Sequence, residues 1–160
     1  MEKPTRKLTR MKGYDYSQEA AFFVTICAHE NKHIFGEISK IDGVNVFTPS
    51  RIGEIVEEIF FQLPARFPEF ELTHFCLLPN HLHFLVLKNE IELPKKRSLS
   101  EFVGAFKSLS DRAVRNEMSF VRIWQKSFND HIIRNEKDYQ THWLYIEENV
   151  NRWGNDQYFL

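Results

Sequence analysis

The chain has the composition of an ordinary globular protein and an almost neutral charge. Its 160 residues are enough for one compact domain with a real core, and too few for two comfortable ones. Hydrophobic residues make up 42% of the chain and charged residues of mixed sign 27%, which excludes a disordered or fibrous protein. The formal net charge of −1 argues mildly against a nucleic-acid partner, because domains that bind nucleic acids are often strongly basic.

Nothing in the sequence indicates a membrane or an oxidising compartment. The apolar runs are far shorter than the roughly 20 residues that a spanning helix needs, and the basic N-terminus lacks the apolar segment of a signal peptide. Cys27 and Cys76 lie in apolar runs and fit buried, reduced thiols better than a disulfide framework. We therefore expect a cytoplasmic protein without a membrane contact.

Basic residues are unevenly distributed along the chain. One group forms an N-terminal arm, residues 1–13, that includes Arg10 and Lys12. A second group, between residues 95 and 115, includes Lys107 and Arg112. Such runs are most often solvated faces, but local basic patches on a neutral protein are also compatible with phosphate binding.

Hydrophobic periodicity predicts alternating strands and helices from residue 20 onward. The expected strands are residues 20–30, a hairpin of residues 33–38 and 43–47, residues 70–78 and residues 81–88. The expected helices are residues 49–68, a second helix after Ser98, and a last helix that follows Asn135 and runs through Val150. A short strand and a loop are expected within residues 120–133. This order predicts a single domain over residues 1–160, an α+β sandwich with helices against a central antiparallel sheet.

Polar residues at the expected helix starts support these boundaries. Ser50 is a suitable N-cap for the first helix, and Asn135 for the last. Ser98 and Glu101 have the spacing of a capping box at the start of the second helix.

Two histidines interrupt the apolar strand at residues 81–88. On a strand, positions i and i+2 point to the same side, so His81 and His83 lie about 7 Å apart along one face. Two imidazoles in that arrangement can share one divalent metal ion, which would satisfy two buried polar rings at once. They can equally be ordinary core histidines that bond to the backbone, and the pair alone leaves both interpretations open.

The last helix offers a nucleophile and further ligands. Tyr145 and Asn149 are four residues apart and lie on one helical face. A tyrosine hydroxyl can act as a covalent nucleophile, and an amide oxygen can bind a hard metal ion. Tyr145 can also be an ordinary core residue, and the nearby carboxylates of Glu147 and Glu148 are alternative ligands.

Three segments resemble one known family. The segment "LLPNHLHFLVL" resembles the "MPNHxH" segment of the single-tyrosine HUH transposases. "IWQKSFNDHIIRNEKDY" followed by "YIEEN" resembles the "WQ…DHIIRNEKDY…YIxxNP" block of the REP-associated tyrosine transposases, and "YDYSQEAAFFVTICAHENKHIFGEI" resembles their N-terminal part. The resemblance extends over most of the chain, from about Tyr14 to Trp153.

The resemblance implies a fold, a reaction and residue roles. The fold is the ferredoxin-like sandwich of the HUH endonucleases, usually in a homodimer. The activity is cleavage and strand transfer on single-stranded or hairpin DNA, through a 5′-phosphotyrosine intermediate and a free 3′-hydroxyl. By position, His81, His83 and Asn149 correspond to metal ligands and Tyr145 to the nucleophile.

The chemistry of the implied roles is consistent. Mg²⁺ or Mn²⁺ would polarise the scissile phosphate, and a tyrosine with an ordinary pKa near 10 needs such help at neutral pH. Two imidazoles and an amide oxygen suit Mn²⁺ at least as well as Mg²⁺. The sequence departs from the family pattern at Val150, where the family has a proline; without that proline the helix is free to continue past Asn149. Tyr139 is a competing nucleophile, which we interpret as a structural residue.

Other positions are candidates for DNA contact. Arg134 and His131 match family positions; Arg134 suits a phosphate contact, and His131 suits either a DNA contact or a structural hydrogen bond. Lys107, Arg112, Arg10 and Lys12 are further candidates.

Two functions compete with the transposase. One is a DNA-binding regulator of the same fold that has lost cleavage. The other is a metallo-phosphodiesterase that uses His81, His83 and a carboxylate to activate water.

Overall fold

The computed structural model describes residues 20–119 and 122–155, in the order β1, η1, β2, β3, α1, β4, β5, α2, β6, α3, η2. The strands are β1 Ala20–Cys27, β2 Gly36–Ile41, β3 Val44–Pro49, β4 Phe70–Leu78, β5 His81–Lys88 and β6 Asn129–Ile132. The helices are α1 Arg51–Arg66, α2 Leu99–Glu117 and α3 Glu136–Glu148, with short 3-10 turns η1 His29–Asn31 and η2 Trp153–Asn155. Within these ranges no helix combines the length and the apolar character needed to cross a membrane.

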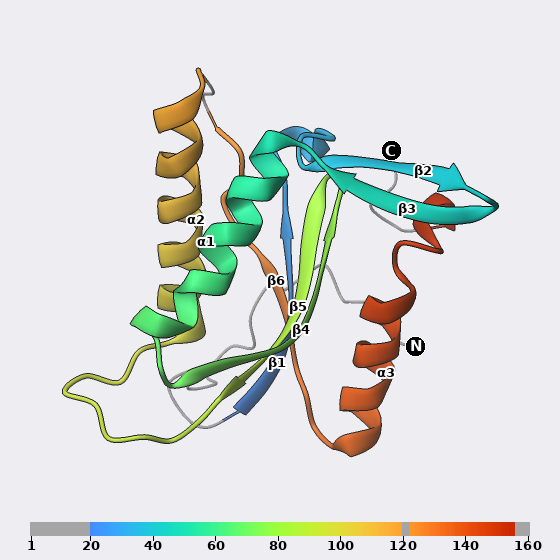
Figure 1. Cartoon of the computed structure of the whole chain (residues 1–160). Coiled ribbons are helices and arrows are strands. Elements are labelled where there is room, and N and C mark those ends of the chain that lie inside the picture. Colours follow the sequence, from blue (N-terminus) through green and yellow to red (C-terminus); the bar gives the residue numbers. More distant parts are fainter. Residues whose placement is uncertain (1–19, 120–121, 156–160) are drawn as a thin grey trace.

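Four strands form one antiparallel sheet in the order β4-β5-β1-β6. With α1 between β1 and β4 and α2 between β5 and β6, this is the ferredoxin-like βαββαβ arrangement, and the β2–β3 hairpin is inserted after β1. Figure 1 shows α1 and α2 on one side of the sheet and α3 on the other, with the hairpin extending above the end of α3. The predicted α+β fold is confirmed.

The face of the sheet toward α1 and α2 carries the main hydrophobic core. Alternate residues of the two central strands point into it, and it is rich in phenylalanine, as the fifteen phenylalanines of the sequence predict. The residues of β1 and β5 in this core are Phe22, Val24, Ile26, Leu82, Phe84 and Val86. Leu82, Phe84 and Val86 therefore anchor β5 on the side opposite to its two histidines.

The face toward α3 is more polar. Its apolar contacts form a small cluster in which Phe23, Leu85 and Ile146 are buried. The other side chains on this face include the histidines of β5, which leave the sheet on the same side as Leu85. The face toward α1 and α2 therefore mainly stabilises the fold. The polar face toward α3 carries the candidate functional residues.

The predicted helix starts are confirmed by their capping contacts. Ser50 Oγ accepts a hydrogen bond from the Gly53 amide at 3.1 Å. The capping box of α2 is complete between Ser98 and Glu101, and Asn135 Oδ1 accepts from the Asp138 amide at 2.8 Å.

Some predicted boundaries are wrong. The first hairpin strand begins at Gly36 rather than at residue 33, and the turn lies at Asp42 and Gly43, both with positive φ. The last helix ends at Glu148 and does not continue through Val150. Each difference is of the few residues by which the ends of strands and helices are commonly misplaced.

Two helical glycines differ in the space around them, which gives a first prediction. A Cβ on Gly53 would lie 2.0 Å from the backbone oxygen of Phe35, whereas a Cβ on Gly104 would meet nothing within 4 Å. We expect Gly53→Ala to lower the free energy of unfolding by about 1–3 kcal/mol through overpacking. Gly104→Ala, the matched control, should raise it by up to about 1 kcal/mol, because alanine favours a helix interior. Urea unfolding measures both, and equal effects of the two changes would contradict the packing.

Candidate active site

His81 and His83 converge on one point at the start of β5. Their Nε2 atoms lie 3.0 Å apart, and both side chains are buried. Two cis ligands of an octahedral ion at bond lengths of about 2.1 Å are also about 3 Å apart. The separation of the two nitrogens therefore already fits a shared metal ion.

The far side of each ring is held by a buried polar partner. His81 Nδ1 lies 2.7 Å from Asn80 Oδ1, and His83 Nδ1 lies 2.7 Å from Thr25 Oγ1 on β1. Because an amide oxygen can only accept, His81 Nδ1 donates, and the lone pair of a neutral His81 remains on Nε2. Such partners fix the orientation of ligating imidazoles in metal sites.

Burial keeps both rings neutral. It lowers the pKa of His83 to about 3, with a further contribution from His142. Burial also lowers the pKa of His81 well below its ordinary value, helped by His83 and His33. A metal ion binds the neutral form of imidazole, so both rings are in the form that a metal ion requires.

The same pKa shifts predict how stability depends on pH. The unfolded histidines take up protons with a pKa near 6.5, whereas buried His81 and His83 do not, so stability is complete above pH 6.5 and is lost as pH falls toward 3. We expect the free energy of unfolding of metal-free protein to fall by about 1 kcal/mol per histidine between pH 6.5 and 5.5. Urea unfolding in a chelator measures this. His83→Gln should show a shallower dependence, and an identical dependence in both proteins would contradict the assignment.

Tyr145 lies on the sheet-facing side of α3, beside these histidines. Its ring packs edge-on against His83, with the centroids 5.3 Å apart, and against Phe23 of β1 at 5.9 Å. Both contacts are within one chain, so a single chain brings the tyrosine to its own histidines. Tyr139, the competing tyrosine, packs against the apolar cluster of this face, which favours its structural interpretation.

Asn149 ends α3 with a buried amide. Its Nδ2 donates to the Tyr145 carbonyl at 2.7 Å, while its buried Oδ1 has no hydrogen-bond partner among the described residues. It stands one turn after Tyr145, whose ring contacts His83, and one turn before Trp153, whose ring stacks on His81 at 6.1 Å. A third metal ligand would have an oxygen at this position that is buried and not yet hydrogen-bonded, and Asn149 Oδ1 is such an oxygen. The three residues therefore fit a divalent metal ion.

The β2–β3 hairpin holds the end of α3 in place. Asn45 Nδ2 lies within hydrogen-bonding distance of two carbonyl oxygens, 3.0 Å from Val150 and 3.2 Å from Asn151. The helix ends at Glu148 and turns follow it, although Val150 replaces the proline of the family pattern.

The alternative carboxylate ligands are engaged elsewhere. Glu147 forms an ion pair with His74 on β4 at 2.8 Å, and Glu148 pairs with Arg152. Both carboxylates that the sequence suggested as alternative ligands therefore have other partners.

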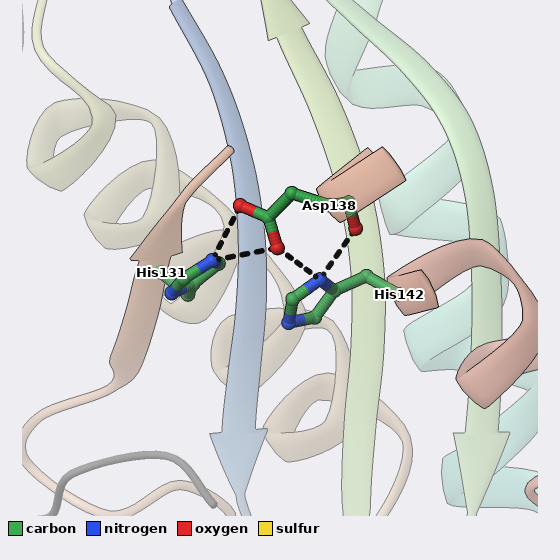
Figure 2. A group of neighbouring side chains, drawn as sticks. All are labelled: His131, Asp138 and His142. Carbon is green, nitrogen blue, oxygen red and sulfur yellow. Dashed lines mark hydrogen bonds and ion pairs between the residues drawn. The ribbon is translucent and has the colours of Figure 1, made fainter. Parts of the chain in front are cut away.

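His131 takes part in a cluster that the sequence did not suggest. Its Nε2 lies 2.8 Å from Asp138 Oδ2, and His142 Nδ1 lies 3.1 Å from Asp138 Oδ1, as Figure 2 shows. The structure therefore supports the interpretation of His131 as a residue with a structural hydrogen bond, and the partner is Asp138. Arg134, next to this cluster, is exposed and remains a candidate for phosphate contact; its backbone amide donates to Asp138.

The remaining basic residues that are candidates for DNA contact lie away from the histidines of β5 or outside the described residues. The Lys107 ammonium donates to the carbonyls of Gln125 and Ser127 at 2.8 and 2.9 Å, which gives it a structural role, and its contact with DNA stays a prediction. Arg112 is exposed, but α2 lies on the side of the sheet opposite α3. Arg10 and Lys12 lie outside the described residues.

Sequence comparison gives the class of the protein. Residues 23–149 match the family described as "Transposase IS200 like". Since this match covers well over half of the chain, the chain belongs to the IS200-like transposases, and its fold is that of a REP-associated tyrosine transposase.

Two solved structures and one further protein are similar to this chain. A solved REP-associated tyrosine transposase, bound to a REP hairpin, matches with a TM-score of 0.66 and 20% identity over 91% of this chain and 75% of that one. A putative transposase from Deinococcus radiodurans R1 matches with a TM-score of 0.52 and 15% identity over 87% of this chain and 95% of that one. An uncharacterized protein of Haemophilus influenzae is 27% identical, covering 97% of this chain and 93% of the relative.

Proposed function

We propose that this protein cleaves and rejoins single-stranded DNA, with Tyr145 as the nucleophile and a divalent metal ion held by His81, His83 and Asn149. The observation that carries the proposal is the position of the Tyr145 ring, whose centroid lies 5.3 Å from that of His83. The Nε2 atom of His83 in turn lies 3.0 Å from that of His81. Membership of the IS200-like transposases supports this class of reaction, and the geometry supports its assignment to particular residues.

The reaction is an exchange of phosphodiester bonds. The Tyr145 oxygen bonds to the scissile phosphorus and the bond to the 3′ oxygen breaks, which leaves a 5′-phosphotyrosine and a 3′-hydroxyl. The phenolic proton passes to solvent, and the departing 3′ oxygen takes up a proton. Attack of a second 3′-hydroxyl on the phosphotyrosine reverses these steps and releases Tyr145, so rejoining needs no ATP.

The residues around Tyr145 divide the remaining tasks. A bound Mg²⁺ or Mn²⁺ would withdraw charge from the phosphate oxygens. Asn80 and Thr25 fix the orientation of the two histidines through their Nδ1 atoms. The exposed Arg134 is suited to hold a neighbouring phosphate of the strand.

We propose hairpin-forming repeats as the substrate, because the REP-associated relative of this fold is bound to a REP hairpin. Each chain contains a complete set of candidate residues, so the homodimer that the resemblance implies is not needed to assemble the site.

Covalent trapping tests the proposal. The full chain is incubated with a single-stranded hairpin oligonucleotide, labelled at its 3′ end, and with Mn²⁺ or a chelator. We expect a labelled adduct that survives denaturant and requires Mn²⁺. Hairpin binding without any adduct would instead support an inactive DNA-binding regulator, and hydrolysis without an adduct a metallo-phosphodiesterase.

A further inference from the structure

We propose a second metal site, formed by His131, Asp138 and His142, for a nitrogen-preferring divalent ion such as Zn²⁺. This site is separate from the metal site proposed at His81, His83 and Asn149 and does not depend on the proposed DNA chemistry. Figure 2 shows the three side chains meeting where β6 approaches the first half of α3.

The geometry brings three ligand atoms together. One atom from each residue lies within 4.8 Å of the other two. His131 Nε2 lies 3.1 and 2.8 Å from the two oxygens of Asp138, and His142 Nδ1 lies 3.1 Å from Oδ1. Two imidazoles and a carboxylate are the ligand set of many three-residue zinc sites, which leave a fourth position for water.

The local structure explains why these residues meet. Asp138 and His142 are four residues apart on α3 and therefore share a helical face. His131 pairs with Phe23 across the β1–β6 ladder, so its ring leaves the sheet toward α3. The two imidazole rings lie 4.6 Å apart. The His131 side chain is 32% exposed, so its ring has room to rotate toward an ion.

The charges also suit a cation. Burial tends to raise the pKa of Asp138, but the hydrogen bonds from His131 and from the Arg134 amide outweigh it and keep the pKa below its ordinary value. Burial lowers the pKa of His142, which leaves its imidazole neutral at neutral pH. In the structure, His131 Nε2 donates to the Asp138 carboxylate, and His142 Nδ1 lies 2.8 Å from the Asp138 backbone carbonyl oxygen as well as 3.1 Å from Oδ1. An ion replaces these contacts when each ring moves its proton to its other nitrogen.

The position gives the ion a structural consequence. It links β6 to the N-terminal half of the helix whose C-terminal half carries Tyr145. Asp138 already bonds to His131 and to the Arg134 amide. The ion adds a second connection between β6 and α3. Separating α3 from the sheet therefore costs more free energy when the ion is bound.

Equilibrium dialysis of the full chain against Zn²⁺, followed by metal analysis, tests the second site. We expect two equivalents in the wild type. His131→Gln should weaken the second equivalent by more than about 100-fold. The double variant His81→Gln and His83→Gln should keep one equivalent, and the matched control His29→Gln, a partly exposed histidine that belongs to neither site, should keep two.

Two further readouts make the outcome clear. Co²⁺ in place of Zn²⁺ should give a visible absorption band at the second equivalent that His131→Gln removes. Zn²⁺ should also raise the Tm of the double variant but not that of a triple variant with His131→Gln added. One wild-type equivalent, lost with His81 and His83 and unchanged in His131→Gln, would overturn the proposal and leave the cluster as a hydrogen-bonded brace.

Discussion

Tyr145→Phe is expected to abolish formation of the covalent DNA adduct. The change removes one oxygen and keeps the ring that packs against His83 and Phe23. Removing a nucleophile leaves the rest of the site unable to replace it, so we expect a loss of more than about 10³-fold in the rate of adduct formation. Gel analysis of the labelled oligonucleotide in denaturant measures it.

Tyr139→Phe is the matched control. Tyr139 is on the same helix and packs against the same small apolar cluster. Its variant should form the adduct at nearly the wild-type rate. Hairpin affinity and thermal stability of both variants should remain close to wild type. If Tyr145→Phe still forms the adduct while Tyr139→Phe does not, the nucleophile is Tyr139 and the proposed geometry is wrong.

Replacing either converging histidine should produce the second large effect. His83→Gln or His81→Gln removes a nitrogen from the pair that lies 3.0 Å apart, and direct ligands matter more than the outer partners whose loss typically costs 10–100-fold. We therefore expect Mn²⁺-dependent adduct formation to fall by more than about 100-fold. A Mn²⁺ titration of adduct formation measures the change in both rate and metal requirement.

His74→Gln is the control for this effect. His74 is a partly buried histidine on β4, and it pairs with Glu147 and stacks on Trp143, both on α3. Its loss should leave the Mn²⁺ requirement unchanged. An equal loss in His74→Gln and His83→Gln would show that the effect is general destabilisation rather than loss of a ligand.

Local patterns in the sequence predict much of this fold. The two-residue period of β5 places His81 and His83 on one face and Leu82, Phe84 and Val86 on the other, and burial of the three apolar residues confirms this. Helix starts were predictable too, because capping involves residues only three positions apart.

Contacts between distant segments were not predictable in the same way. Thr25 reaches His83 only because β1 and β5 are neighbours in the sheet, and Asn45 reaches the end of α3 from a hairpin about a hundred residues earlier. Lys107 is a basic residue of the type that contacts DNA, but its ammonium donates to two carbonyls of the loop before β6. The role of a charged side chain depends on what surrounds it, and a single sequence does not give that.

The cluster of His131, Asp138 and His142 could be predicted from the sequence only in part. Asp138 and His142 have a spacing that places them on one helical face, which the sequence could have indicated. The third member, His131, joins them only when β6 pairs with β1. The assignments of His81, His83, Asn149 and Tyr145 to catalysis, and the single domain over residues 1–160, remain predictions to be tested in solution.

The most direct test is to identify the residue that carries the DNA. The trapped adduct is digested with a nuclease and a protease, and the peptides are analysed by mass spectrometry. We predict a nucleotide attached through its 5′ phosphate to Tyr145, in a peptide from α3. Attachment to any other residue, or cleaved DNA with no modified peptide, would contradict the proposed mechanism.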